Sequence, residues 1–491
     1  MNEKRGSWGS NVGFLLASIG SAVGLGNIWG FPYKMGKSGG FTFLIVYLAL
    51  GLFVGLSIMM AELAMGRKTG KGAIGAYREL APKFTWLGWL AVLSPFIILS
   101  FYTVLGGYCM EYMVLNLSDL AFGITQTTRT GNELFGSMLQ NPLGTWMFTF
   151  ILILLCYFIN RNGVSGGIEK FNKIGMPALF VMLVIIIIRS VTLDDAAEGL
   201  KYMFVPGYSV KAGFIKPEDA PGLLSVIAIA GGQMFFSLSL AMGIMITYGS
   251  YLSKKENLVK NSVVIVFADT LVALMAGLAV IPAAVAKYGT EAKLNGPNLL
   301  FVTLQDVFDS MGAIGPLFGT LFYLLVLIAA ITSIISLIEV GSTYYVDRAQ
   351  SKGKEPNRSK IVLWICVAIM AEATIVAVDG LGSNGVYVPF QGTFKALGIG
   401  NAAGIVGSFN DCWLDFMDCI SEGLMMPLGA LVMSLMVGWV LKPKALLGEI
   451  TSGGSSWIAP FFKFCIRFVC PIGMVLILAG QISDFFGLGW F

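Results

Sequence analysis

The sequence of 491 residues contains no histidine, and only 12% of its residues carry a charge. The absence of imidazole excludes histidine metal sites and histidine-based catalytic triads, and it removes the side chain most often used for acid–base catalysis. The scarcity of charge, beside 56% hydrophobic residues and a mean hydropathy of +0.78, leaves too little polar surface for a soluble protein. The composition therefore predicts a polytopic membrane protein, and we expect no enzyme activity.

The chain also lacks a cysteine framework. Its seven cysteines lie in or beside apolar segments and have no metal-ligand spacing. We therefore interpret them as small core residues, and we expect neither disulfides nor a zinc site.

Eleven apolar segments are each long enough to cross the hydrocarbon core of a bilayer, which takes about 20 residues of helix. A single transmembrane domain, residues 1–491, accounts for the whole chain. The first segment has no small-residue cleavage site after it, so we expect it to be retained rather than removed as a signal peptide. The segments lie near residues 11–33, 40–65, 86–117, 144–159, 167–190, 225–252, 259–286, 313–346, 360–378, 412–441 and 459–483.

Lysine and arginine are unevenly distributed among the connections between these segments. With the N-terminus in the cytoplasm, about two thirds of the 32 basic residues lie on the inside, in agreement with the positive-inside rule. We therefore expect a multi-pass protein of the plasma membrane, which in bacteria is the inner membrane, with a cytoplasmic N-terminus and an outside C-terminus. The long outside connections 191–224, 287–312 and 379–411 are interpreted as lids.

Two segments are interrupted by small and polar residues near the middle of the bilayer. The first reads Gly20-Ser21-Ala22-Val23-Gly24-Leu25-Gly26-Asn27, and the sixth carries the stretch from Gly231 to Gly243. Glycine costs about 1 kcal/mol relative to alanine inside a helix, and a carbonyl freed in hydrocarbon must find a partner. Broken helices of this kind bind coupling ions and small charged substrates. For the first stretch, the alternative interpretation is a glycine-rich face for helix packing.

The interrupted segments are the first and the sixth, so they hold corresponding places in two groups of five. Because five is odd, the two groups have opposite orientations, which predicts a 5+5 inverted repeat with a site at its junction. We expect an all-α polytopic membrane protein of eleven helices. Repeat one would lie near 11–190, repeat two near 225–441, and an additional helix near 459–483.

Three ionisable residues, Glu62, Asp269 and Asp415, are expected inside the membrane, where an unpaired charge is costly. Asp269 lies about two turns into the seventh segment and could supply the negative charge that an alkali cation and a substrate amine need. The alternative is a structural aspartate that joins helices. In the eighth segment, Ala329 and Thr332 share a helix face, where a hydroxyl can ligate a hard cation or bond back to its own helix.

The stretch Ser21-Ala22-Val23-Gly24-Leu25-Gly26-Asn27-Ile28-Trp29 closely resembles the neurotransmitter:sodium symporter family, particularly its bacterial eleven-helix amino-acid transporters. The resemblance is long, and it becomes weaker only in the last three segments. It continues at Phe31-Pro32-Tyr33, Glu62, Met65-Gly66-Arg67, Tyr102, Phe235-Phe236-Ser237-Leu238-Ser239-Leu240, Thr247-Tyr248 and Ala329 to Ser333.

The resemblance implies two sodium sites beside one substrate pocket. All their ligands would be oxygen atoms, which suit a hard cation. The first site would also include the substrate carboxylate, and because chloride-requiring members lack a carboxylate there, Asp269 implies a carrier that does not need chloride. The protein ligands of the first site would be the Ala22 carbonyl, Asn27, Ser237 and Asp269. Those of the second would be the carbonyls of Gly20, Val23 and Ala329 and the hydroxyls of Thr332 and Ser333.

The resemblance also implies where an amino acid would bind. Its carboxylate would lie at a half-helix N-terminus, on the amides of Leu25 and Gly26 and the hydroxyl of Tyr102. Gly24 stands where monoamine carriers of the family place an aspartate, so it leaves room for that carboxylate. The amine would meet the unwound backbone near Phe236 and Ser237. The other expected pocket residues are Ala22, Ile98, Ser239, Met242, Ser333 and Leu337.

The gates of the family are matched only in part. The family usually has an arginine at the position of Gly30, which forms an outer gate with an aspartate that resembles Asp415. Either Lys34, one turn later, replaces the arginine, or Tyr102 and Phe236 close the outside alone; the sequence leaves both open. The residues implied for the inner gate are Arg5, Trp8, Tyr251 and Asp347.

The leading hypothesis is a sodium-coupled symporter that imports neutral, hydrophobic or aromatic, amino acids by alternating access and without chloride. Its partners would be an amino acid, sodium ions and the lipid bilayer, with no nucleic acid, and both a monomer and a dimer fit the sequence. The alternative hypothesis is a membrane sensor of sodium and amino acid on the same fold, which binds both without net transport.

Overall fold

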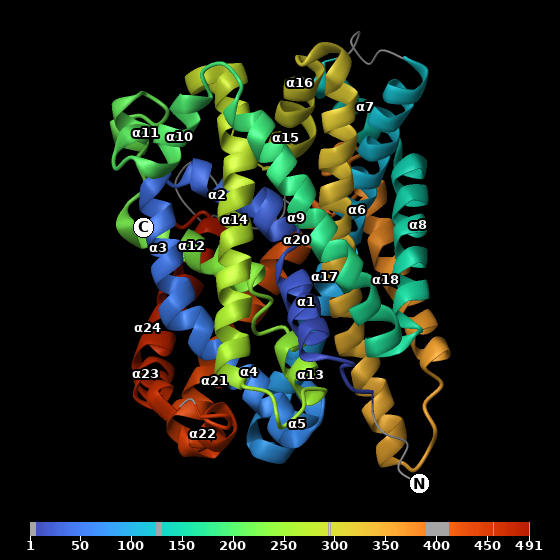
Figure 1. The fold of residues 1–491 in the computed structure, drawn as a ribbon, viewed down its shortest axis with the longest axis vertical. Helices are drawn as coiled ribbons and strands as arrows, with labels where there is room; N and C mark the ends of the chain where they lie inside the picture. Colours follow the sequence, from blue (N-terminus) through green and yellow to red (C-terminus); the bar gives the residue numbers. More distant parts are fainter. Residues whose placement is uncertain are drawn as a thin grey trace.

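The computed structural model describes residues 6–123, 130–292, 294, 296–388, 412–454 and 456–490. Within these ranges the chain forms helices and no strand, so the predicted all-α polytopic class is confirmed. Long helices run side by side, and short helices cover both ends of the bundle (Figure 1). We call the end that carries the N-terminus the N-terminal end and the opposite one the distal end. Arg5, expected in the inner gate, lies outside the described residues.

Each of the eleven predicted segments coincides with a helix or a pair of helices. The first is a bent pair, α1 (Asn11–Ala22) and α2 (Phe31–Lys37), and the sixth is α12 (Leu223–Ser237) followed by α13 (Ile244–Ser250). Nine further described helices are long and apolar enough to cross a membrane. They are Phe41–Thr69, Pro82–Phe122, Pro142–Asn160, Val164–Val191, Leu258–Glu291, Gly312–Ser351, Arg358–Asp379, Trp413–Val440 and Ser456–Phe485. The inverted repeat itself stays a prediction.

The labels of Figure 1 divide these long helices at their kinks. The parts used below are α3 (Phe41–Leu50), α4 (Leu56–Thr69), α6 (Thr85–Phe122), α8 (Pro142–Asn160), α9 (Lys170–Val191), α14 (Leu258–Tyr288), α17 (Gly315–Ser351), α18 (Arg358–Asp379), α20 (Trp413–Asp418), α21 (Met426–Leu435), α23 (Ala459–Phe464) and α24 (Cys470–Phe485). Short helices at the N-terminal end are α5 (Ala73–Leu80) and α22 (Lys444–Ile450), and those at the distal end are α7 (Gly131–Leu139), α10 (Ala196–Phe204), α11 (Tyr208–Lys211), α15 (Gly296–Asn298) and α16 (Leu304–Asp309).

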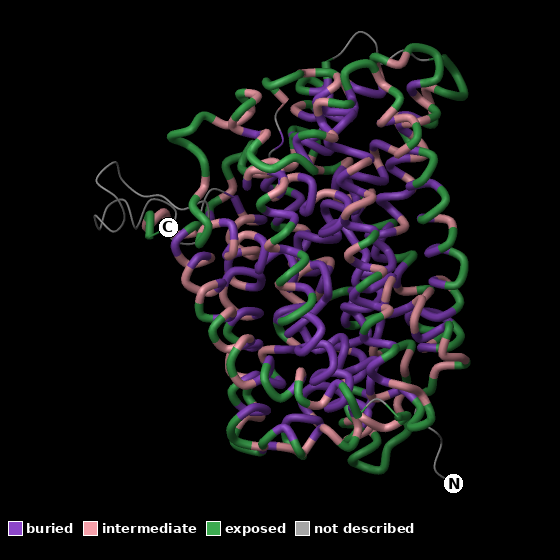
Figure 2. Tube along the Cα trace, turned by 60° about the vertical axis from the view of Figure 1, so that its left-hand side comes forward, coloured by how far each residue is buried: buried purple, intermediate pink, exposed green. Residues whose placement is uncertain are grey.

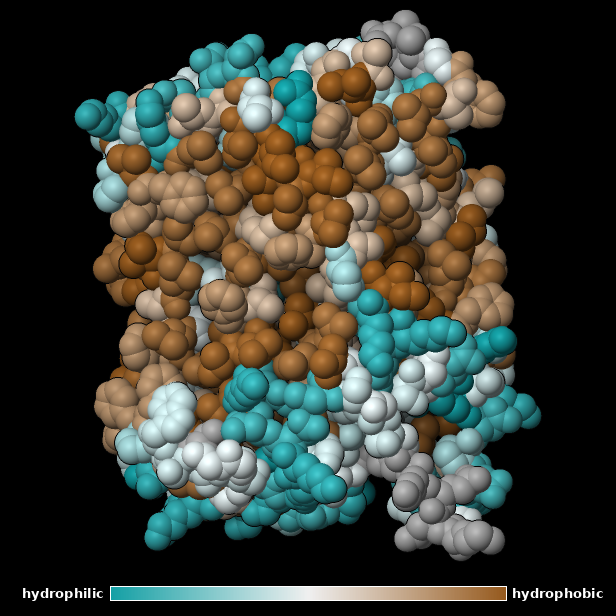
Figure 3. Space-filling model, in the orientation of Figure 1, coloured by the Kyte–Doolittle hydropathy of each residue, from teal (hydrophilic) through white to brown (hydrophobic). Residues whose placement is uncertain are grey.

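Burial and hydropathy separate the bundle into an interior, a belt and two ends. Buried residues run through the interior along the length of the helices (Figure 2). In the view of Figure 3 the middle of the outer surface is hydrophobic, and hydrophilic residues gather toward the two ends. An apolar belt between polar ends is the surface that a bilayer solvates.

Glycines bring the helices around the centre into close contact. A Cβ on Gly66 of α4 would overlap the Ile246 carbonyl of α13, and a Cβ on Gly249 would lie 2.5 Å from the Leu63 carbonyl of α4. Small residues at such crossings let backbones approach, which is the usual way helices associate in a membrane. This contact holds α13, the second half of a broken helix, against α4.

The second break begins later than the sequence stretch that predicted it. α12 continues through Gly231 and Gly232, and the backbone leaves the helix only at residues 238–243. Both glycines pack against α24, where an added Cβ would overlap Ile477 or Gln481. These two glycines therefore serve helix packing rather than the break.

The two breaks differ in backbone conformation. In the first, α1 ends at Ala22 and the π-helical turn η1 (Gly26–Gly30) leads into α2, with a bend of 47° between the halves. The second contains left-handed backbone at Ser239 (φ 53°), Ala241 (φ 61°) and Gly243 (φ 73°). For residues with a Cβ this conformation costs roughly 1–2 kcal/mol, so contacts from other helices must stabilise it.

Candidate functional site

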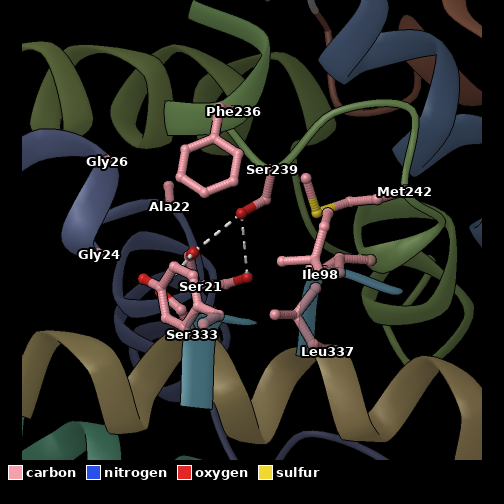
Figure 4. A pocket seen from close by; sticks show the side chains of 12 residues that line it. Ser21, Ala22, Gly24, Gly26, Ile98, Phe236, Ser239, Met242, Ser333 and Leu337 are labelled. Atoms are coloured by element: carbon pink, nitrogen blue, oxygen red, sulfur yellow. Dashed lines mark hydrogen bonds between the residues drawn. The ribbon is translucent and has the colours of Figure 1, made fainter. Parts of the chain in front are cut away.

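The two breaks border a small cavity in the middle of the bundle (Figure 4). Its volume of about 20 Å³ is close to that of one water molecule, so wall side chains must move before a larger molecule fits. The lining includes nine of the eleven expected pocket residues and excludes Leu25 and Ser237. The lining residues are Ser21, Ala22, Gly24, Gly26, Ile98, Tyr102, Phe236, Ser239, Met242, Ile244, Ser333 and Leu337.

Ser21 of α1 connects the second break and α17 at this cavity, although the sequence did not single it out as a site residue. Its carbonyl accepts hydrogen bonds from the hydroxyls of Ser239, at 2.8 Å, and Ser333, at 3.2 Å (Figure 4). The first of these bonds supports the left-handed backbone of the second break. Ser239 and Ser333 are far apart in the sequence, so the sequence did not indicate that their hydroxyls share one acceptor.

Gly24 and Tyr102 shape the side of the cavity that the first break forms. The Leu25 amide, freed by the break, donates to the Tyr102 hydroxyl at 2.8 Å. A Cβ on Gly24 would overlap both the Tyr102 hydroxyl and the Ser333 hydroxyl. Any side chain at this position would therefore take the space in front of the freed amides.

Asp269 of α14 is the centre of a buried hydrogen-bond cluster behind the cavity. Its Oδ1 accepts from the Asn27 amide group at 2.7 Å, and both carboxylate oxygens accept from the Ser237 hydroxyl at 3.0 Å. Asn27 also bonds its own segment, because its Oδ1 accepts from the Gly24 amide at 3.1 Å. The structure therefore brings together three of the side chains expected in the first sodium site, and all three are 0% exposed.

Tyr47 of α3 is a further member of this cluster, and the sequence analysis missed it. Its hydroxyl lies 3.2 Å from Ser237 Oγ and donates to Asp269 Oδ2 at 3.4 Å. A lone tyrosine in an apolar segment is ordinary, so the sequence held no signal for it. The carboxylate thus has three polar side chains around it, and among the described residues no lysine or arginine forms an ion pair with it.

The hydroxyls expected in the second sodium site have partners within the protein. Thr332 donates to the Ala329 carbonyl of its own helix at 2.9 Å, which is the back-bonded state the sequence left open. Ser333 donates to Ser21 of α1. Val23 directly follows α1, with extended angles (φ −76°, ψ 96°) that turn its carbonyl out of the helical pattern. Helices α1 and α17 therefore meet here through oxygen-bearing groups.

Comparison with known proteins identifies the architecture. The family model described as "Sodium:neurotransmitter symporter family" matches residues 5–141 and 133–390 of the chain. The chain belongs to the sodium:neurotransmitter symporter family. It is therefore a sodium-dependent transporter and a multi-pass membrane protein.

Relatives of this symporter include both uncharacterised and named proteins. It is 32% identical over 489 residues to an uncharacterised sodium-dependent transporter, YhdH, of Bacillus subtilis (strain 168), with 98% of each chain covered. It is 24% identical to the human sodium- and chloride-dependent GABA transporter 2, covering 95% of this chain and 78% of that one. A crystal structure of MhsT in complex with L-phenylalanine is 32% identical and matches with a TM-score of 0.80, over 97% of this chain and all of that one.

At the distal end of this symporter, Lys34 of α2 forms an ion pair with Glu422 at 2.7 Å. Glu422 lies in the π-helical turn η11 (Cys419–Met425), about two turns beyond Asp415. The space beside Gly30 is taken by Gln233, whose Oε1 would lie 2.8 Å from a Cβ at that position. Lys34, one turn after Gly30, therefore pairs with an acid about two turns beyond Asp415.

Two other contacts involve residues that the sequence analysis named for the outer gate. The rings of Tyr102 and Phe236, which both line the cavity, lie 6.1 Å apart between their centres. Asp415 accepts a hydrogen bond from the Cys412 thiol at 3.1 Å. The ion pair of Lys34 is with Glu422, whereas the sequence analysis had set Lys34 opposite Asp415. Which of these groups close the outer gate stays a prediction.

The expectation of only three ionisable residues inside the membrane is wrong. Besides Glu422, Glu339 of α17 is 0% exposed and forms an ion pair with Arg358 of α18. Each of these acids forms an ion pair with a cation from another helix, and the pairing offsets the cost of burying its charge in an apolar segment. The linear sequence does not display such pairings.

At the N-terminal end the contacts are more numerous. The Trp8 indole donates to the Tyr248 carbonyl at 3.1 Å, and its ring stands edge-on to the rings of Tyr248 and Tyr251. The Tyr251 hydroxyl donates to Glu339 at 3.0 Å, and Asp347 accepts from the Gly72 amide at 2.9 Å. Three of the four expected inner-gate residues therefore lie at one end of the bundle, and Arg5 is outside the described residues.

The helix α22 is fastened to this end through Glu449. Its carboxylate pairs with Lys254 at 2.5 Å and with Arg67 at 3.0 Å. Burial disfavours the charged form, but the hydrogen bond and charge of Lys254 and the charge of Arg67 outweigh it and hold the pKa of Glu449 below its ordinary value. The ion pairs thereby keep α22 beside α4 at neutral pH.

Proposed function

We propose that this sodium-dependent transporter imports neutral, hydrophobic or aromatic, amino acids together with sodium by alternating access, without a need for chloride. The observation that carries the proposal is the environment of Asp269. Its buried carboxylate has hydrogen-bond donors on Asn27, Ser237 and Tyr47 but no ion pair within the described chain. A buried carboxylate with donors and no counter-charge is a place for a cation.

In the proposed first sodium site, the Ala22 carbonyl and the Asn27, Ser237 and Asp269 side chains supply oxygen ligands. The Ser237 hydroxyl and the Asn27 amide group can turn from donating to Asp269 to presenting oxygen to the ion. The ion then compensates the charge of Asp269, and the substrate carboxylate completes the site. Because Asp269 is itself the negative group beside sodium, chloride has no role to fill.

In the proposed second site, sodium lies between α1 and α17. Its ligands are the carbonyls of Gly20, Val23 and Ala329 with the hydroxyls of Thr332 and Ser333. Rotation of two hydroxyls away from their present carbonyl acceptors is enough to offer their lone pairs. Because the ion would be coordinated by groups of both helices, it would hold α1 against α17 while it is bound.

The proposed substrate is an α-amino acid with an uncharged side chain. Its carboxylate would meet the amides of Leu25 and Gly26 and the Tyr102 hydroxyl, and its amine the backbone carbonyls near Phe236. Ile98, Met242 and Leu337 offer its side chain an apolar surface that contains a flexible thioether. The family neighbour MhsT, solved with L-phenylalanine, supports an aromatic or large apolar side chain.

The proposed orientation places the N-terminal end in the cytoplasm and the distal end outside, at the plasma membrane. Trp8, Tyr251 and Asp347 would then belong to the inner gate. Lys34 and Glu422, with Tyr102 and Phe236, would form the outer gate. The positive-inside distribution of lysine and arginine supports this orientation.

Uptake into proteoliposomes tests the proposal directly. Purified protein is reconstituted and given labelled phenylalanine, leucine, glycine, glutamate or lysine, with a gradient of sodium or of potassium, in chloride or in gluconate. We expect concentrative uptake of phenylalanine or leucine with sodium, and the same rate in gluconate. Loss of uptake in gluconate would refute chloride independence, and preference for a charged amino acid would refute the substrate class.

The same vesicles separate transport from sensing. A sensor would bind sodium and amino acid, as measured by scintillation proximity on the purified protein, without accumulating label inside vesicles. Sodium-dependent binding without accumulation would therefore favour the sensor.

A further inference from the structure

A second and much larger hollow lies on the flank of the bundle, away from the two breaks. It is a groove of about 710 Å³ between α6, α17 and α18, three helices that pack on one another. Its walls are mainly aromatic and aliphatic, and its lining includes Gly341 and Leu337. Leu337 also lines the central cavity. The characteristic wall residues are Trp89, Phe96, Tyr345, Ile361 and Trp364.

The groove opens onto the apolar flank of the bundle. Trp364 is 69% exposed, and Leu363 and Val367 beside it on α18 are 45% and 48% exposed. Exposed apolar side chains on a transmembrane helix face lipid, so the neighbour that fills an apolar groove there is an acyl chain. A water-soluble ligand would have to leave water to reach these walls.

One rim of the groove is basic. Lys354, in the loop between α17 and α18, and Lys360, in the first turn of α18, line this rim, and the loop lies at the N-terminal end (Figure 1). Both lysines are exposed, and within the described ranges neither forms an ion pair. Among the described residues that line the groove, Glu355 is the only acid, and Lys352 and Arg348 are nearby in the sequence. The rim therefore carries a net positive charge beside an apolar wall.

We propose that this groove binds one anionic phospholipid. Its phosphate would lie on Lys354 and Lys360, and one acyl chain would pack along Trp89, Phe96 and Trp364. Positive charge at a membrane surface selects anionic headgroups, and the apolar wall selects a molecule with a chain. That this lipid belongs to the cytoplasmic leaflet rests on the orientation proposed above, whereas the binding itself does not.

The experiment measures lipid retained by the purified full chain in native mass spectrometry. Phosphatidylglycerol and phosphatidylcholine with identical acyl chains are offered at equal concentration, without sodium or amino acid, so the outcome is independent of transport. We expect the first phosphatidylglycerol to bind about tenfold more tightly than phosphatidylcholine. Equal retention of the two lipids would overturn the proposal.

Two variants locate the bound lipid. In K354Q/K360Q the preference should disappear, whereas K83Q/K444Q, which removes two exposed lysines outside the groove, should keep it. Retention of the preference in K354Q/K360Q, or its loss in the control, would refute the assignment to this rim.

The third variant, Gly341→Leu, fills the groove. A Cβ at Gly341 meets only Ile365 Cδ1, at an ordinary contact distance of 3.5 Å, so the helix accepts it. We expect at least a fivefold loss of bound phosphatidylglycerol. Gly136→Leu, at a helical glycine of α7 with open space around it, is the matched control and should bind as the wild type does. Thermal unfolding of each variant confirms that it is folded, and undiminished binding to folded Gly341→Leu would place the lipid elsewhere.

Discussion

Asp269 and Glu62 are two buried carboxylates beside the two helix breaks, and their surroundings differ. Asp269 is contacted by the side chains of Asn27, Ser237 and Tyr47. Glu62 of α4 accepts one hydrogen bond, from the Ala241 amide at 2.7 Å, and its Oε2 has no partner among the described residues. Side-chain donors can turn away to admit an ion, whereas a backbone amide in a fixed turn cannot. The surroundings of Asp269 therefore suit an ion-binding site, whereas Glu62 suits a structural role in which it stabilises the second break.

At each break a backbone amide donates a hydrogen bond to a side chain of another helix. At the first break the Leu25 amide donates to the neutral Tyr102 hydroxyl, at 2.8 Å. At the second break the Ala241 amide donates to a carboxylate, at 2.7 Å. A neutral acceptor leaves the amides at the first break available to an anion, whereas a carboxylate occupies the second permanently. The comparison therefore favours the first break for the proposed carboxylate position and a structural role for the second.

The largest expected effect is that of Asp269→Asn, which removes the charge and keeps the shape. We expect the sodium concentration for half-maximal substrate binding to rise roughly 100-fold, equivalent to about 3 kcal/mol, because a buried cation loses its counter-charge. Transport should fail or become dependent on chloride. Sodium titrations in chloride and in gluconate measure this. Asp379→Asn, a change at another buried aspartate far from the breaks, is the control; an unchanged sodium requirement in Asp269→Asn would remove Asp269 from the site.

Tyr102→Phe tests the first break. Loss of a hydroxyl that would bind a charged substrate carboxylate costs about 1.5–3 kcal/mol, so amino-acid affinity should fall about tenfold or more. Equilibrium binding at saturating sodium gives the value. Tyr112→Phe on the same helix removes a hydroxyl that has no partner in the described structure and should leave affinity unchanged. An amino-acid affinity equal to that of the wild type in Tyr102→Phe would exclude the proposed contact between the substrate carboxylate and the Tyr102 hydroxyl.

Glu62 should respond in stability rather than in sodium dependence. In Glu62→Leu the buried Ala241 amide loses its acceptor, which costs about 1–3 kcal/mol, and the melting temperature should fall. In Glu62→Gln the amide oxygen can still accept, so the fall should be smaller. Thermal unfolding in detergent and a sodium titration separate the two roles. A rise in the sodium requirement of Glu62→Gln comparable to that of Asp269→Asn would abolish the distinction between the carboxylates.

The smallest expected effect is that of Tyr47→Phe. It removes one donor of the Asp269 cluster, a change of about 1 kcal/mol, and should shift the sodium titration about fivefold. Tyr323→Phe removes a comparable buried hydrogen bond, to the Leu300 carbonyl at 2.9 Å, at a site not shared with Asp269. If both variants shift sodium binding equally, Tyr47 acts through general packing and not through the carboxylate.

Much of the fold could be predicted because membrane helices are encoded locally. Each helix satisfies its own backbone hydrogen bonds, so length and apolar composition located all eleven segments. The break in α1 was also visible, since glycines and Asn27 interrupt an apolar run. The break in the sixth segment was placed less well, because Gly231 and Gly232 pack against α24, a contact that local sequence does not contain.

Some residues of the candidate site could likewise be selected from the sequence, and others could not. Asp269 and Ser237 could be selected from the sequence, because a carboxylate or hydroxyl in an apolar segment requires a reason. Tyr47 and Ser21 could not, since a tyrosine and a carbonyl are unremarkable until another helix brings a partner to them. The pairing of Lys34 with Glu422 was also hidden, as the sequence offered several acids and no distances.

The sequence by itself determined the membrane class, the places of the apolar segments and the broken first helix. Those properties follow from hydropathy and backbone chemistry over about 20 consecutive residues. The tertiary structure decided which acid faces which base, which hydroxyls share the Ser21 carbonyl and where the second break begins. Such choices depend on distances between helices far apart in the chain, because a hydrogen bond or ion pair requires atoms to lie within about 3–4 Å.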